Sequence, residues 1–279
     1  MNLPFVYIIV LNWNGKNILS DCLNSLMSVK YDNYKVLLVD NGSSDGSVDY
    51  VKNEYPEVEL LVLEKNYGYA GGNNLGFDYA KGKKAKFVIF LNNDTIVDEN
   101  FVEPLLVPFN DPNVGQTVPK IFYADEKEKI WYAGGRVNLW TGNIFHEGIR
   151  EYNNGRFDQS KITDYATGCC FCVKMNDFEK LNGFDETFSM YAEDTDVSLR
   201  IQKLGKKVMF SPESIIWHKV SSSIGGELSF KKIIRKYRGY LKLYQLHATP
   251  FQWITTVICS PFLLLTNIIK YFRLRFFDS

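Results

Sequence analysis

Four clusters of polar side chains, each directly after an apolar run, carry groups that bind sugars, phosphates or metal ions. They are Asn12-Trp13-Asn14, Asp40-Asn41, Asn66 with the glycines after it, and Asn92-Asn93-Asp94. Each cluster also has an ordinary structural explanation, because Asn, Asp and Gly form turns and cap helices. Asp94 is therefore a candidate metal ligand, and a simple surface turn is the alternative.

Three acids within residues 193–196 are candidates for proton transfer. Glu193, Asp194 and Asp196 precede a stretch with helical spacing. Acids at the start of a helix are favoured by its dipole, so one or two of them need no functional explanation. Three within four residues still leave a candidate general base. His218 ends the apolar run SIIW, where a metal ligand and a hydrogen-bonded core histidine are both open interpretations.

The elements that must position these residues alternate along the first hundred residues. Four short runs rich in Val, Ile and Leu are typical of strands buried on both faces: Phe5–Leu11, Val36–Val39, Val58–Leu63 and Phe87–Leu91. Between them, apolar residues recur at helical spacing, namely Leu19, Cys22, Leu23 and Leu26, then Val48, Val51 and Tyr55. This alternation predicts right-handed βαβ units and a parallel sheet. Ligands bind beyond the carboxyl ends of such strands, so we expect the four clusters at one edge.

After Asp94 the pattern is less regular. The stretches WYAGGRVN, ITDYATGCCFCVKM and KKVMFSP indicate strands, and FEKLNGFDETF indicates a short helix followed by a turn. The N-terminal run is interpreted as a first core strand rather than a signal peptide. We expect one α/β domain over residues 1–227.

Composition narrows the class of protein and its compartment. The chain has 279 residues, with 32 Lys and Arg against 32 Asp and Glu, so we expect no nucleic-acid partner. Five cysteines, an odd number, favour a reducing compartment over a disulfide framework. Cys169, Cys170 and Cys172 lack the spacing of a zinc site. The sequence CCFCV predicts a buried strand, with a thiol function as the alternative.

The C-terminal region, residues 228–279, differs from the rest in charge and hydropathy. It contains nine Lys and Arg but one acid, a net charge of about +8, and the remainder of the chain carries about −8. Residues 248–269 contain no charge, a length that could span a bilayer. Pro250, Pro261 and basic residues on both flanks oppose a span. We expect helices lying on the membrane surface, and leave open a span, a packed hairpin or a homodimer contact.

Taken together, these stretches resemble the inverting nucleotide-sugar glycosyltransferases of family 2, which have the GT-A fold, and especially their rhamnosyltransferase-like branch. The motifs that carry the resemblance occur in order: IIVLNWNG, VDNGSSDGS, NYGYAGGNNLG, FLNNDT, TGCCF, GFDETFSMYAEDTDVSLR and IWHKVSSS. The resemblance implies an α/β GT-A fold, with a mostly parallel, Rossmann-like central sheet and helices on both faces.

The resemblance also assigns functions to individual residues. Its donor-binding set is Trp13, Asp40, Asn66, Gly68, Asn74, Asn92 and Asp94. Asp94 matches the second aspartate of the family's D-x-D signature and His218 a further metal ligand. Asn92 replaces the first aspartate, and its neutral amide is a weaker ligand. Asp194 matches the catalytic base, with Glu193 as the fallback. Residues 165–170 and Glu193 fall where acceptors are commonly contacted.

The expected reaction moves a sugar, with rhamnose as one candidate, from a nucleoside-diphosphate donor to a hydroxyl of a saccharide or lipid-linked saccharide. Such transfer builds cell-surface polysaccharides. The implied cofactor is Mg²⁺ or Mn²⁺, since a carboxylate with diphosphate suits Mg²⁺ and an imidazole ligand favours Mn²⁺. We expect a cytoplasmic protein, peripheral on the inner face of the cytoplasmic membrane. Two alternatives are a sugar-phosphate nucleotidyltransferase and a non-catalytic module that binds nucleotide sugars.

Overall fold

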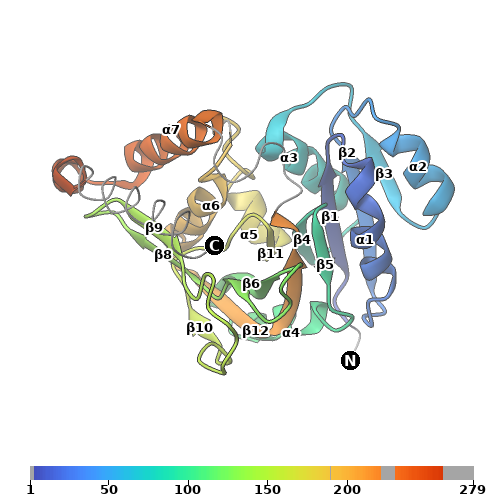
Figure 1. The fold of residues 1–279 in the computed structure, drawn as a ribbon, viewed down its shortest axis with the longest axis horizontal. Coiled ribbons are helices and arrows are strands. Elements are labelled where there is room, and N and C mark those ends of the chain that lie inside the picture. Colours follow the sequence, from blue (N-terminus) through green and yellow to red (C-terminus); the bar gives the residue numbers. More distant parts are fainter. Residues whose placement is uncertain (1–2, 189, 221–229, 260–279) are drawn as a thin grey trace.

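The computed structural model describes residues 3–188, 190–220 and 230–259 (Figure 1). The expected domain boundary at residue 227 and the apolar run beyond residue 259 lie outside the described residues. In chain order the elements are β1 Val6–Asn12, α1 Lys16–Met27, β2 Tyr34–Asp40, α2 Ser47–Glu54, β3 Glu59–Val62, α3 Gly68–Lys81, β4 Phe87–Asn92, β5 Thr95–Val97, α4 Val102–Leu106, the 3-10 helix η1 Val107–Asn110, β6 Val114–Tyr123, β7 Ile130–Tyr132, β8 Gly135–Asn138, β9 Asn143–His146, β10 Lys161–Ile162, β11 Cys170–Lys174, α5 Met175–Lys180, α6 Glu193–Lys203, β12 Lys207–His218 and α7 Phe230–His247.

The four predicted strands form the parallel half of one central sheet. Their spatial order is β3-β2-β1-β4, and β1 pairs in parallel with both β2 and β4. The register sets Asn12 opposite Asp40, and Leu11 opposite Asn92. The carboxyl ends of the three strands therefore meet at one edge, as the alternating pattern predicts.

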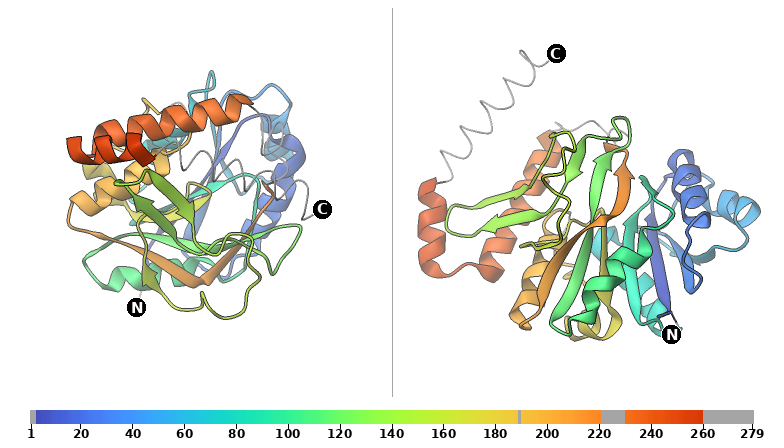
Figure 2. Two further views of the ribbon diagram at one scale, coloured as in Figure 1. Left: turned by 60° about the vertical axis from the view of Figure 1, so that its left-hand side comes forward. Right: turned by 90° about the horizontal axis from the view of Figure 1, so that it is seen from below.

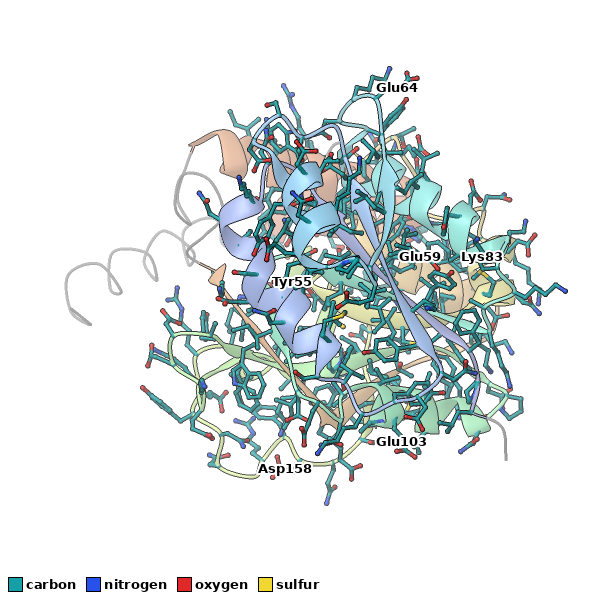
Figure 3. All side chains as sticks on the ribbon, turned by 90° about the vertical axis from the view of Figure 1, so that its right-hand side faces the viewer. Tyr55, Glu59, Glu64, Lys83, Glu103 and Asp158 are labelled. Carbon is teal, nitrogen blue, oxygen red and sulfur yellow. The ribbon has the colours of Figure 1, made fainter. Side chains whose placement is uncertain are left out.

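The other half of the sheet is mixed. The antiparallel strand β11 lies between β4 and β6, and β12 pairs in parallel with β6. The sequence does not predict β6, because it contains Pro119 and the buried Lys120. Lys120 is stabilised by an ion pair of 2.5 Å with Asp158, which is labelled in Figure 3. The predicted stretches KKVMFSP and SIIW belong to one strand, β12, which has an irregularity between Ser211 and Ile215.

Helices cover both faces of the parallel half, with α1 and α3 on opposite sides (Figures 1 and 3). The helix α3 packs closely on β1 and β2, because Gly76 faces side chains of Ile9 and Val39. On the other side, α1 is joined to the end of α2 by a hydrogen bond of 3.0 Å from Tyr55 to Asn24. The predicted apolar face of α1 is buried in the core. The expected fold, a mostly parallel sheet between helices, is confirmed.

A short strand that the sequence does not predict determines where Asp94 lies. After β4 the chain turns at Asn93 and Asp94 and continues as β5, which pairs antiparallel with the end of β12. In this pairing Thr95 lies opposite His218. Two residues 124 positions apart in the sequence, Asp94 and His218, thereby become neighbours.

The helix α7 lies across α6, at the end of the molecule away from α1 and α2 (Figure 2). Leu243 of α7 is fully buried against Phe188 and Ala192. Residues 250–259 are helical as well, and Thr256 donates a hydrogen bond of 2.9 Å to the carbonyl of Leu139. Within the described part of the chain, no helix has the length and hydropathy needed to cross a bilayer.

Candidate active site

A hydrogen-bonded network joins the ends of β1, β2 and β4. Asn12 is fully buried and donates through Nδ2 to Asp40 Oδ2 at 3.0 Å, while its Oδ1 accepts from Asn93 Nδ2 at 2.8 Å. The other Asp40 oxygen accepts from the Ser43 backbone N–H at 2.9 Å. Asn93, which lies in the turn after β4, thus also links the ends of β1 and β4 through its side chain. Trp13 directly follows Asn12 and is 48% exposed, so its indole is accessible for stacking.

The loop before α3 is tied to the same edge. Asn41 donates through Nδ2 to Asn66 Oδ1 at 3.1 Å and to the Gly68 carbonyl at 3.0 Å. Gly68 has a φ of 76°, which only glycine adopts readily. Asn66 and Gly68 therefore lie at the predicted donor edge.

Asn74, another predicted donor-binding residue, makes different contacts. Its Nδ2 donates to the Phe184 carbonyl at 3.0 Å and to Glu186 Oε1 at 2.9 Å, and its Oδ1 accepts from the Phe184 N–H at 2.8 Å. These three bonds fasten α3 to the loop that leads toward α6. A direct contact of Asn74 with a donor stays a prediction.

Asp94 and His218 form a pair with metal-ligand chemistry. His218 Nε2 lies 3.2 Å from Asp94 Oδ1, and both side chains are nearly buried. This contact does not have hydrogen-bond geometry, and Asp94 Oδ1 and His218 Nδ1 have no hydrogen-bond partner among the described residues. His218 is therefore not a fully hydrogen-bonded core histidine. Two ligands at neighbouring octahedral positions, each about 2.1 Å from an ion, lie about 3 Å apart. The pair therefore fits a divalent ion.

This site would be sparse in protein ligands. The described part of the chain contains no group of three or more His, Cys, Asp or Glu side chains that could hold a metal. Mg²⁺ is commonly held by one or two carboxylates together with phosphate oxygens and water. The Asp94–His218 pair is consistent with an ion that is held largely by a bound diphosphate.

The two acids at the start of α6 are presented by a strained turn. Tyr191 and Ala192, directly before them, have φ values of 73° and 74°. A left-handed conformation costs a non-glycine residue about 1–3 kcal/mol, and such strain persists only where the surroundings enforce it. The turn places Glu193 and Asp194 at the wall of a pocket rather than along a free helix end.

Asp194 is held by hydrogen bonds through both of its carboxylate oxygens, whereas one oxygen of Glu193 has none among the described residues. Asp194 Oδ2 accepts from the Gly168 N–H at 2.7 Å, and Oδ1 accepts from the Thr195 N–H at 2.6 Å. Glu193 Oε2 is buried and has no hydrogen-bond partner among the described residues. Asp196, the third acid, pairs instead with Arg200 and His247 and has a structural function.

The protonation of this pair follows from burial. Burial, reinforced by the charge of Asp194, raises the pKa of Glu193 to about 8. Burial also raises the pKa of Asp194, but the N–H donors from Gly168 and Thr195 oppose that shift. Two adjacent carboxyls share their titration, and the donors favour the negative charge on Asp194. Near neutral pH, Glu193 therefore retains its proton, and of the two carboxyls Asp194 is the one whose negative charge is stabilised by N–H donors.

One pocket of about 330 Å³ collects these groups. Its lining includes Asn92, His218, Glu193 and Asp194, and it also includes residues that the sequence does not indicate. Those are Tyr69, Trp131, His146, Lys236 and Tyr240. Burial lowers the pKa of His146 to about 4, so this imidazole is neutral at physiological pH. The additional residues come from α3, β7, β9 and α7, and no local motif relates them.

Comparisons with known families agree with this arrangement. Residues 7–181 match Glycosyl transferase family 2. Residues 157–220, which include the strained turn and His218, also match the family described as N-terminal domain of galactosyltransferase.

Several characterised proteins are similar in sequence. The chain is 25% identical over 240 residues to N-acetylglucosaminyl-diphospho-decaprenol L-rhamnosyltransferase of Mycobacterium tuberculosis, covering 78% of each chain. It is 23% identical to Rhamnosyltransferase WbbL of Escherichia coli, covering 74% of this chain and 80% of that one. It is 26% identical to O-antigen biosynthesis protein RfbC of Myxococcus xanthus, and the match covers 79% of this chain but only 18% of that protein.

Two solved structures share the fold. GalNAc-T7 with UDP, GalNAc and Mn²⁺ superposes with a TM-score of 0.70 at 18% identity, over 90% of this chain and 49% of that one. The mannosyltransferase PcManGT from Pyrobaculum calidifontis, in complex with GDP-Man and Mn²⁺, has a TM-score of 0.60 at 17% identity, over 97% and 81%. These likenesses support the GT-A architecture.

The raised pKa of Glu193 predicts how stability depends on pH. The folded protein keeps the Glu193 proton up to about pH 8, whereas the unfolded chain loses it near pH 4.5. The contribution of this proton to the free energy of unfolding is therefore complete below about pH 4.5 and is lost as the pH rises toward 8. Glu193→Gln should therefore gain stability relative to wild type as pH rises from 5 to 8, with a limiting slope of about 1.4 kcal/mol per pH unit. Urea unfolding at several pH values measures this, and a pH-independent difference would contradict it.

Proposed function

The chain belongs to glycosyl transferase family 2, and we propose that it is a metal-dependent, inverting hexosyltransferase. The donor is a nucleoside-diphosphate sugar, and the acceptor is a hydroxyl of a saccharide or lipid-linked saccharide in polysaccharide assembly. One observation carries the proposal: His218, the neighbour of Asp94, lines the same pocket as the acids Glu193 and Asp194. The group that would bind a diphosphate-associated ion and the group that would accept a proton thus meet in one site.

The donor would bind across the carboxyl ends of β1, β2 and β4. Trp13 offers an exposed indole for a base, and the buried Asp40 lies behind it at the end of β2. Asn92 is a neutral oxygen ligand for sugar or ribose hydroxyls. Asp94 and His218 would hold the divalent ion, which when bound neutralises charge on the departing diphosphate.

Proton transfer is assigned to Asp194. As the acceptor oxygen forms its bond to the anomeric carbon, the bond to the diphosphate breaks and Asp194 takes the hydroxyl proton. The N–H groups of Gly168 and Thr195 hold the carboxylate in place. The aromatic rings of Trp131, Tyr165 and Tyr240 line the same pocket and offer apolar faces to an acceptor sugar.

Rhamnose is the first donor sugar to consider. The names of the mycobacterial and Escherichia coli relatives support it, since both are rhamnosyltransferases. The name of the mycobacterial relative also supports a lipid-linked diphosphate acceptor. A nucleotidyltransferase or a non-catalytic binding module would have no need for an acceptor base beside the donor edge.

Attachment to the cytoplasmic face of a membrane is a further part of the proposal. In the helical residues 250–259, Phe251, Ile254, Val257 and Ile258 are all more than half exposed. Their spacing places them along one side, opposite the buried Thr256. The net positive charge of residues 228–279 complements anionic lipids. All five cysteines are free, in keeping with a reducing compartment.

Replacing the proposed base tests the reaction. A screen of nucleotide sugars, starting with dTDP-rhamnose, each with and without Mg²⁺ or Mn²⁺, first identifies the donor that the protein turns over. Asp194→Asn should then lower turnover at least about 100-fold, because general-base catalysis contributes 10²–10⁴-fold, and should leave nucleotide affinity nearly unchanged. Asp78→Asn, on the exposed side of α3, is the control. Wild-type turnover by Asp194→Asn would exclude the assignment.

The metal site has a separate test. Asp94→Ala and His218→Ala should each reduce the gain in nucleotide affinity that Mn²⁺ produces, by about tenfold or more for Asp94, since a charged ligand is lost. Isothermal titration of nucleotide with Mn²⁺ and with EDTA measures this gain directly. In EDTA all three proteins should bind alike. A full Mn²⁺ response in Asp94→Ala would refute the assignment.

Membrane attachment is tested by flotation of the full chain with anionic liposomes. Replacing Phe251, Ile254 and Ile258 together by Ser should move the protein from the floating to the soluble fraction, and Gln245→Ala, on the exposed side of α7, should not. Equal flotation of the triple variant would contradict the proposal. A wild-type protein that fails to float, and forms a dimer that the substitutions dissociate, would identify this face as a homodimer contact.

A further inference from the structure

The turn before α6 needs an external support. Tyr191 and Ala192 both adopt left-handed backbone conformations, which a Cβ atom makes unfavourable. The next two residues are Glu193 and Asp194, so any relaxation of the turn would move both carboxyls. The structural question is therefore what holds this turn.

The backbone of α7 lies directly against it at Gly239. A Cβ atom at this buried position would lie 2.3 Å from the Tyr191 carbonyl oxygen and 3.3 Å from that of Met190. Gly in a helix interior is unfavourable relative to Ala. Here its missing side chain permits a contact between helix and turn that no other residue type allows.

Packing one helical turn further along α7 strengthens this contact. Leu243 is fully buried against Phe188, which precedes the strained turn, and Ala192, which ends it. Tyr240 packs against the same small cluster and also lines the pocket that holds Asp194. The helix thus contacts both the support of the acids and the cavity in front of them.

The end of α7 is fastened to α6 itself. His247 Nε2 lies 2.7 Å from Asp196 Oδ1, and these two side chains are 3% and 2% exposed. The other Asp196 oxygen accepts from Arg200 at 2.7 Å. Asp196 lies on α6 shortly after Glu193 and Asp194. The helix α7 therefore contacts the strained turn before these two acids and the part of α6 that follows them.

From these contacts we propose that α7 is a positioning element of the active site, and that Gly239 is its central positioning residue. By holding the turn at residues 190–192, α7 sets the direction of Glu193 and Asp194 toward the pocket. This inference rests on the proposed function of Asp194 as the base. It gives the C-terminal region a function in catalysis that is separate from any contact with a membrane.

The test compares two identical substitutions at different glycines. In Gly239→Ala the new methyl group displaces the turn, so kcat should fall at least tenfold, while nucleotide affinity and the KM for donor stay within about twofold. The pH dependence of kcat should also shift, because the carboxyls change surroundings. Gly82→Ala is the matched control, since a Cβ there approaches no atom closer than 3.4 Å. A Gly239→Ala enzyme with kcat and pH profile like those of Gly82→Ala would overturn the proposal.

A second pair of variants covers the case in which Gly239→Ala no longer binds nucleotide and is misfolded. Leu243→Ala leaves space beneath Ala192 and should lower kcat at least fivefold with donor affinity retained, whereas Leu246→Ala, on the exposed side of the same helix, should not. Equal kcat in these two variants would then refute the proposal. Measuring Asp194→Asn in the same assay distinguishes a failure of the proposed function from a failure of the positioning proposal. If it remains active, the proposed function is wrong; if it is inactive and the α7 variants are unaffected, only the positioning function is wrong.

Discussion

The parallel register of β1 with β2 and β4 is the constraint on which the rest of the site depends. It sets Asn12 beside Asp40 and brings the end of β4 to the same edge. The buried amide of Asn12 then bonds to both neighbours, through Asp40 on one side and Asn93 on the other. A shift of one residue would turn Asn12 to the opposite face of the sheet and break both bonds. The polar edge and the hydrophobic core therefore stabilise the same register.

The site contains two carboxyl groups, those of Asp94 and Glu193, that are buried with one oxygen lacking a hydrogen-bond partner within the described residues. On one side, Asp94 Oδ1 is left without one, a cost that an ion bound between Asp94 Oδ1 and His218 Nε2 would offset. On the other side, Glu193 avoids the cost of a buried charge by remaining protonated, since burial raises its pKa to about 8. The negative charge is directed to Asp194, where N–H donors receive it.

The helix α7 connects the two proposals made for the C-terminal region. One part of it closes the pocket through Tyr240 and supports the turn through Gly239. The helical residues that follow expose an apolar side. If this side contacts a membrane as proposed, an acceptor anchored there would meet a pocket whose wall belongs to the same C-terminal region. This arrangement would place the reacting hydroxyl without a separate acceptor domain.

Local patterns in the sequence determined the parallel half of the fold and the types of residue at its edge. Buried strands leave continuous apolar runs, and polar residues such as Asp40 and Asn92 follow directly where those runs end. The sequence could not predict β6, whose Pro119 and Lys120 break the apolar pattern, because tertiary pairing with β12 and β11 stabilises it. That pairing is non-local, and no sequence periodicity records it.

The geometry of the proposed active site was decided by the tertiary structure alone. Asp94 and His218 are neighbours only because β5 pairs with the end of β12. The direction of Asp194 depends on a strained turn that α7 holds from 45 or more residues away in the chain. Residue types and strand ends are local properties, so the sequence by itself determines them. Distances between groups far apart in the chain, and the burial that shifts their pKa values, exist only once the elements pack.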